Sequence, residues 1–99
     1  MKLSDRVTTA PEVMAKQLEG ETVLLDLAGG MYYGLNPVGS RIWELLDAGT
    51  GRLLSEVCDV MLREFEVTRD ELEADVLRIC DELRSRGLLE LAKEPSGAT

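Results

Sequence analysis

Residues 25–46 read LDLAGGMYYGLNPVGSRIWELL. The stretch predicts a strand, a turn at Gly29 and Gly30, a second strand and a capped helix, in that order. Glycine adopts the positive φ angles of such a turn without a steric cost. Asn36 can cap a helix, and Pro37 suits the first helical position. The stretch therefore places a short aromatic strand directly before the start of a helix.

Two strands extend this unit into a sheet. Residues 21–27 carry an apolar face at every second position, which predicts a half-buried strand. Residues 13–18 predict another strand before it. Together with 31–35, these segments form an antiparallel meander of three strands. The third strand is then an edge of the sheet, and an edge strand can accept another peptide.

Apolar residues at helical spacing predict three helices after the meander. The third starts at Thr68, which has capping-box spacing to Glu71, and stops at Gly87. Strands followed by helices indicate an α+β fold, here a winged helix-turn-helix-like domain with a three-stranded antiparallel sheet followed by three helices. We expect the domain to cover 1–91, with helices over 37–48 (ending at Gly49), 53–65 and 68–86, an apolar return segment over 88–91 and a flexible tail over 92–99.

The charge of the chain limits its partners. The 99 residues carry a formal net charge of −8, and the pI is about 4.5. Binding to phosphates requires clustered Lys and Arg, so the balance disfavours nucleic acid and anionic membranes. No apolar run approaches the roughly 20 residues of a membrane span, and no signal peptide is visible. We therefore expect a soluble cytoplasmic protein.

The residue types also argue against catalysis. The chain has no histidine, the commonest general base and metal ligand. Cys58 and Cys80 fall within apolar helical patterns, so we expect buried, reduced thiols. Two thiols cannot complete a zinc site, and neither has a base to activate it. We predict no catalytic residue, no metal and no cofactor. Four carboxylates crowd the start of the third helix, where the helix dipole favours them: Asp70, Glu71, Glu73 and Asp75.

The edge strand and the third helix are the candidate binding elements. Adjacent strand residues point to opposite faces, so either Tyr32 or Tyr33 must face away from the core. Tyrosine has an apolar body and a polar tip, which suits an interface. Ile42 and Trp43 on the first helix are most simply core residues. The third helix has a core stripe of four residues at helical spacing: Leu72, Val76, Ile79 and Leu83.

A groove is expected where this helix passes the edge strand. Leu77 and Cys80 widen the apolar stripe on one side, with Glu73 and Arg84 alongside, and this flank is the predicted wall. The opposite flank, near Asp75 and Glu82, is the alternative. The candidate peptide-binding residues are Met31, Tyr32, Tyr33, Gly34, Leu35, Val76, Leu77, Cys80 and Arg84.

The chain resembles a known family at these positions. The pattern Leu-Asp-Leu-x-Gly-Gly-x-Tyr-Tyr-x-Leu-Asn-Pro-x-Gly-x-x-Ile-Trp-x-Leu-Leu at 25–46 is similar to the PqqD-like family. The stretches 57–65 and 75–89 are similar to it as well. Within the family, the sequence is most similar to the stand-alone B1 proteins of lasso-peptide gene clusters.

The resemblance implies a RiPP recognition element, a domain that binds the leader of a ribosomally made precursor peptide. In such domains the leader adds as a strand to the third strand and packs on the third helix. The lasso branch implies a leader peptidase of the cysteine-protease type, an ATP-dependent cyclase downstream, and leaders with a Tyr-x-x-Pro motif.

Two other functions stay open. The first is a PqqD-type peptide chaperone for a radical SAM enzyme. The second is a winged-helix DNA-binding regulator, which the acidic charge opposes.

Overall fold

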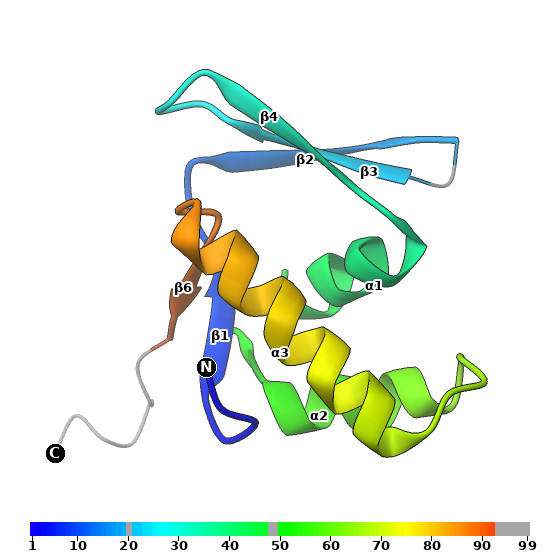
Figure 1. Ribbon diagram of the computed structural model, residues 1–99. Coiled ribbons are helices and arrows are strands. Elements are labelled where there is room, and N and C mark those ends of the chain that lie inside the picture. The colour runs from blue at the N-terminus through cyan, green and yellow to red at the C-terminus, as the bar shows by residue number, and fades with distance from the viewer. Residues whose placement is uncertain (20, 48–49, 93–99) are drawn as a thin grey trace, which may run out of the picture.

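A computed structural model describes residues 1–19, 21–47 and 50–92 of the chain. Within them the chain forms three helices and two small antiparallel sheets (Figure 1). The predicted α+β fold, with a three-stranded meander followed by three helices, is confirmed. The elements are β1 (Arg6–Thr9), β2 (Val13–Leu18), β3 (Glu21–Asp26), β4 (Met31–Leu35), α1 (Pro37–Leu46), β5 (Arg52–Leu53), α2 (Leu54–Leu62), α3 (Arg69–Ser85) and β6 (Leu89–Leu91).

The larger sheet is the predicted meander, in the order β2-β3-β4. Its second hairpin pairs Asp26 with Met31. Gly30 has φ +69° and donates its N–H to the Asp26 carbonyl at 2.8 Å. The Asp26 carboxylate accepts the N–H of Ala28 at 3.1 Å, which stabilises the turn from within. β4 is thus an outer strand of this sheet.

The smaller sheet is an addition to the predicted fold. Its order is β5-β1-β6, and it joins the two ends of the described chain by pairing Thr9 with Leu89. The sequence predicts only an apolar return segment at 88–91, without a partner strand. These strands are two to four residues long, too short for alternation to identify them.

Side-chain caps fix the starts of α1 and α3. The Asn36 side chain accepts the N–H of Gly39 at 2.8 Å, and Thr68 accepts that of Glu71 at 3.2 Å. α1 ends at Leu46 and α2 at Leu62, both before their predicted ends. The predicted stop at Gly49 lies outside the described residues.

The C-terminal part departs little from expectation. Gly87 follows α3 with φ +77°, as its predicted role as helix stop requires. The Ala92 N–H donates to the Arg6 carbonyl at 2.8 Å, so the small sheet holds this residue. The rest of the predicted tail, 93–99, lies outside the described residues.

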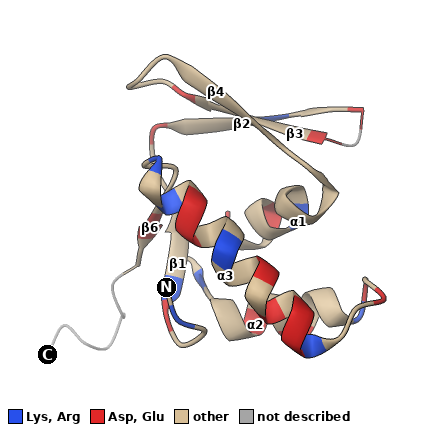
Figure 2. Cartoon of the chain, in the orientation of Figure 1, with Lys and Arg blue, Asp and Glu red and all other residues tan. Residues whose placement is uncertain are grey.

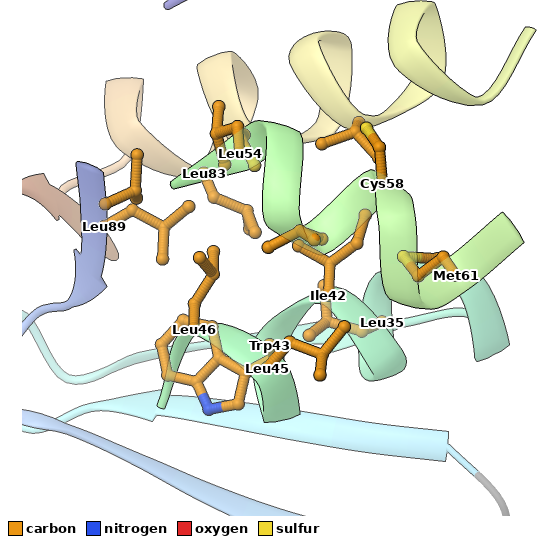
Figure 3. Close-up of a cluster of buried hydrophobic side chains, with 14 of the residues drawn as sticks. Leu35, Ile42, Trp43, Leu45, Leu46, Leu54, Cys58, Met61, Leu83 and Leu89 are labelled. Atoms are coloured by element: carbon orange, nitrogen blue, oxygen red, sulfur yellow. The ribbon is translucent and has the colours of Figure 1, made fainter. Parts of the chain in front are cut away.

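The core lies between the three helices and the inner face of the larger sheet (Figure 3). Ile42 and Trp43 are buried in it, as predicted, and Leu35 joins it from the end of β4. None of the described helices is long and apolar enough to cross a membrane. The side chains buried in full or nearly so include Val7, Leu24, Leu46, Leu54, Val57, Cys58, Met61, Val76, Cys80 and Leu83.

One buried hydroxyl joins the larger sheet to α1. The Ser40 Oγ accepts the N–H of Thr22 at 3.1 Å and lies 3.3 Å from the Leu35 carbonyl, to which it donates. Thr22 and Leu35 are cross-strand partners at the end of the β3–β4 ladder. The serine therefore replaces a ladder hydrogen bond and fixes where β4 ends and α1 begins.

Replacing this hydroxyl should destabilise the domain. In Ser40→Ala the buried Thr22 N–H loses its acceptor, at a cost of about 1–3 kcal/mol. Chemical denaturation would measure the change. Ser85→Ala is the matched control, because the Ser85 hydroxyl donates to the Glu82 carbonyl at an exposed site. Equal losses in the two variants would contradict this role for Ser40.

Candidate functional site

The two adjacent tyrosines of β4 point to opposite faces, as their spacing predicts. Tyr32 is 76% exposed on the face that is turned away from the helices. Tyr33 is half-buried and points toward α3. The strand therefore presents one aromatic side chain to each side of the sheet.

Tyr33 connects β4 to α3 through two charged residues. Its hydroxyl donates to the Glu82 carboxylate at 2.9 Å. The Arg86 guanidinium lies 4.8 Å from the centre of the Tyr33 ring and 3.6 Å from Glu82. We call these three residues the Tyr33 brace. The hydrogen bond to Glu82, with burial as a smaller cause, raises the pKa of Tyr33 above its ordinary value of 10.0.

Two hollows lie along β4, with Tyr33 between them. The first, of about 180 Å³, is polar and reaches the start of α1. The second, of about 250 Å³, is more apolar and lies at the other end of the strand. We call the two together the β4–α3 groove. On one side the groove is lined by residues from β4 to α1: Met31, Tyr32, Tyr33, Gly34, Leu35, Asn36 and Gly39. The opposite wall is formed by residues of α3 and the segment after it, with Asp26 at one end: Arg78, Ile79, Glu82, Arg86 and Leu88.

The predicted strand residues all line this groove, whereas the four predicted α3 residues do not. Val76 and Cys80 are fully buried in the core. Leu77 is half-buried against that core, and Arg84 is exposed. The α3 flank that faces β4 is the one near Glu82, the alternative to the predicted wall. Whether the nine predicted residues contact a peptide stays a prediction.

The difference comes from the rotation of α3 about its axis. Helical periodicity predicts Ile79 within the core stripe and Cys80 at its margin. In the structure Cys80 is fully buried and Ile79 is half-buried, lining the groove. A free cysteine packs as a small hydrophobe, so α3 can turn Cys80 toward the core. The groove residues Arg78, Ile79, Glu82 and Arg86 recur at helical spacing, and this spacing is the sequence signal for the flank that faces β4.

The backbone of β4 has one open side. The Ser40 bridge shows that the Leu35 carbonyl points toward β3. Backbone groups alternate in direction along an antiparallel strand, so Tyr33 points the same way. Tyr32 and Gly34 then direct their N–H and C=O groups to the outer edge. Within the described chain, no strand pairs with that edge.

Both thiols of the chain are buried, and two carboxylates of α3 are held in ion pairs. Burial raises the pKa of Cys58 and raises that of Cys80 to about 12, so both thiols stay protonated at neutral pH. Glu73 pairs with Arg69 at 2.7 Å, and Asp75 with Arg78 at 3.4 Å. Among the described residues, no group of three or more Cys, Asp or Glu side chains could hold a metal ion.

Fold and groove together define an α+β domain of winged-helix type with an open strand edge beside a helix (Figure 1). The chain belongs to the PqqD family. The model of that family, described as coenzyme PQQ synthesis protein D, matches residues 21–89.

Two solved structures share the fold over most of the chain. The structure described as TbiB1 in complex with the TbiA(beta) leader peptide is 34% identical, with a TM-score of 0.78. The alignment covers 88% of this chain and 99% of that one. The second, lasso peptide synthetase B1 complexed with the leader peptide, is 27% identical, with a TM-score of 0.69, and the alignment covers 86% and 98% of the two chains. A search of curated proteins finds no significant match.

The Tyr33 brace should be visible in a pH titration. Tyr32→Phe leaves Tyr33 as the only tyrosine, so phenolate absorbance reports on it alone. We expect a midpoint above the ordinary value of about 10, because Glu82 favours the protonated phenol. The brace is intact below that midpoint and is lost as the pH rises through it.

Adding Glu82→Gln to the Tyr32→Phe variant should lower the midpoint toward the ordinary value. Asp75→Asn removes the same charge from α3 at a site paired with Arg78, and it should leave the midpoint in place. An identical midpoint with and without Glu82 would show that the brace does not form in solution.

Proposed function

We propose that this protein is a non-catalytic RiPP recognition element that binds the leader of a lasso-peptide precursor by strand addition. The open edge of β4, directly beside the wall of α3, is the observation that carries the proposal. The two similar structures, both in complex with leader peptides, support it.

In this proposal the backbone supplies affinity and the groove supplies register. A leader in extended conformation pairs with the outward N–H and C=O groups of Tyr32 and Gly34. Its alternate side chains then point toward α3. Apolar leader side chains fit the hollow between Met31 and Leu88, and polar ones fit the hollow near Arg78. A leader with a Tyr-x-x-Pro motif would place its tyrosine and proline along this groove.

Binding serves delivery in this proposal. The domain holds the precursor in the cytoplasm and presents it to a leader peptidase of the cysteine-protease type, and then to an ATP-dependent cyclase. Holding the substrate beside an enzyme raises its effective concentration without chemistry by the domain itself. Such a role requires no cofactor and no nucleophile of its own.

A second candidate function follows from the family description, which names coenzyme PQQ synthesis. The domain would then act as a peptide chaperone for a radical SAM enzyme. The same groove would bind a different precursor. Titrating the protein with a lasso leader and with a PQQ precursor peptide separates the two functions, because each predicts tight binding of only one.

Strand addition is tested best at Gly34. A Cβ at this position meets no atom within 4 Å, so Gly34→Ala should fold and bind normally. Gly34→Pro removes the outward N–H, and proline is tolerated on an edge strand. We expect leader affinity to fall about tenfold, corresponding to about 1.4 kcal/mol, in the proline variant only. Fluorescence anisotropy of a labelled leader gives both constants.

Circular dichroism of both variants controls for folding. Normal leader binding by a folded Gly34→Pro protein would rule out pairing at this edge. Loss of affinity in Gly34→Ala as well would point to side-chain crowding in the groove instead.

The contribution of α3 can be tested with a matched pair. Ile79 and Leu77 are both half-buried, but only Ile79 lines the groove. Ile79→Ala should weaken leader binding by roughly tenfold, since a lost aliphatic contact costs about 1–2 kcal/mol. Leu77→Ala should lower the free energy of unfolding without changing the affinity for the leader. If Leu77→Ala weakened leader binding and Ile79→Ala did not, the peptide would contact the flank of Leu77, Cys80 and Arg84 instead.

A further inference from the structure

The two hollows of the β4–α3 groove have a fixed spacing along β4. Every second side chain of a strand lies on the same face, so Met31 and Leu35 share the face of Tyr33. The polar hollow lies at the Leu35 end and the apolar hollow at the Met31 end. Side chains of a paired strand lie on the same face as the residues opposite them. A peptide paired with β4 would therefore fill the two hollows with side chains four residues apart.

Three of the four charged side chains that line the groove already interact with other groups of the protein. Glu82 accepts the O–H of Tyr33 at 2.9 Å, and Asp26 accepts the N–H of Ala28 at 3.1 Å. The Arg86 guanidinium lies over the Tyr33 ring and 3.6 Å from Glu82. The fourth charged residue is Arg78, in the polar hollow.

Arg78 is held much more loosely than these three. Its guanidinium has five N–H donors, and within the described chain its ion pair is with Asp75, at 3.4 Å. The two side chains are 66% and 53% exposed, and such exposed pairs hold their partners weakly. Figure 2 shows basic segments among the acidic ones along α3. The polar hollow therefore has a cation with donors to spare, although the chain as a whole is acidic.

A carboxylate is the group that complements this hollow. Its two oxygens can accept parallel N–H bonds from one guanidinium. A strand seated on β4 would shield Arg78 from water, and a shielded cation requires an anionic partner. The hollow, of about 180 Å³, has room for the end of an acidic side chain. The apolar hollow of about 250 Å³, lined by Met31 and Leu88, suits a large apolar side chain instead.

We propose that Arg78 selects peptides with an aspartate or glutamate opposite Leu35, followed four residues later by a large apolar residue opposite Met31. This inference rests on the proposed function, because it assumes that the peptide pairs with β4, antiparallel as β3 does. The net charge of −8 favours basic peptides at long range. An acidic preference at one position must therefore come from a local contact, which makes Arg78 a specificity residue of the groove.

Selection from a library of random short peptides tests the proposal without a known leader sequence. The library is selected in parallel on the parent protein, on Arg78→Gln and on Gly34→Pro, each checked for folding by circular dichroism. We expect peptides from the parent to carry an acidic residue four positions before an apolar one. Arg78→Gln should select the apolar residue without the acidic one, and Gly34→Pro should enrich neither.

A double-mutant cycle then measures the contact itself. A peptide selected on the parent is labelled, and its affinity is measured by fluorescence anisotropy. Replacing its acidic residue by the corresponding amide should weaken binding to the parent about tenfold, and should change binding to Arg78→Gln little. Arg63→Gln is the matched control, because Arg63 is an exposed arginine that lines neither hollow. It should show the same loss as the parent.

The outcomes separate this inference from the proposed function. Peptides that depend on Gly34 but have no acidic preference would overturn the role of Arg78 and leave strand addition intact. An acidic preference that persists in Arg78→Gln, or that Arg63→Gln also abolishes, would overturn that role as well. Failure to select any peptide that depends on Gly34 would overturn strand addition, and this inference with it.

Discussion

The geometry of the domain depends on the junction between β4 and α1. Leu35 is buried in the core, and the next residue, Asn36, caps the helix. The Ser40 hydroxyl then joins the ends of β3 and β4 from within that helix. A strand anchored in this way at one end keeps its position without a neighbour on its outer side. That outer edge can therefore stay open. The groove and the direction of the open backbone groups follow from this anchor.

The Tyr33 brace has a different role from this anchor. Its partners Glu82 and Arg86 are both exposed, and ion pairs of exposed residues contribute about 0–1 kcal/mol. The brace therefore positions α3 against β4 more than it stabilises the fold. Under the proposed function, contacts this weak can rearrange when a leader peptide enters, whereas the core below them stays packed.

Local chemistry made much of this predictable from sequence. The glycine turn and the cap at Asn36 depend only on neighbouring residues, and both form, although the turn spans 27–30 and only Gly30 of its two glycines has a positive φ. The rotation of α3 depends on whether Cys80 or Ile79 packs deeper in the core. The periodicity of the sequence cannot distinguish between these two residues. The small sheet depends on pairing between segments that are distant in the sequence. These strands are too short to show an alternation of apolar and polar residues. Sequence therefore located the open edge strand, and only the fold identified the helix flank opposite it.

The pairing of β1 with β6 has a consequence for the order of assembly. On the ribosome the meander of β2, β3 and β4 contains only short-range pairs, so it can form soon after it emerges. β1 leaves the ribosome first, yet it must wait for Leu89–Leu91 before its sheet is complete. During that interval β4 has an open edge and no α3 beside it. Nascent chains are then more exposed to edge-to-edge aggregation than the folded domain, in which α3 lies beside that edge.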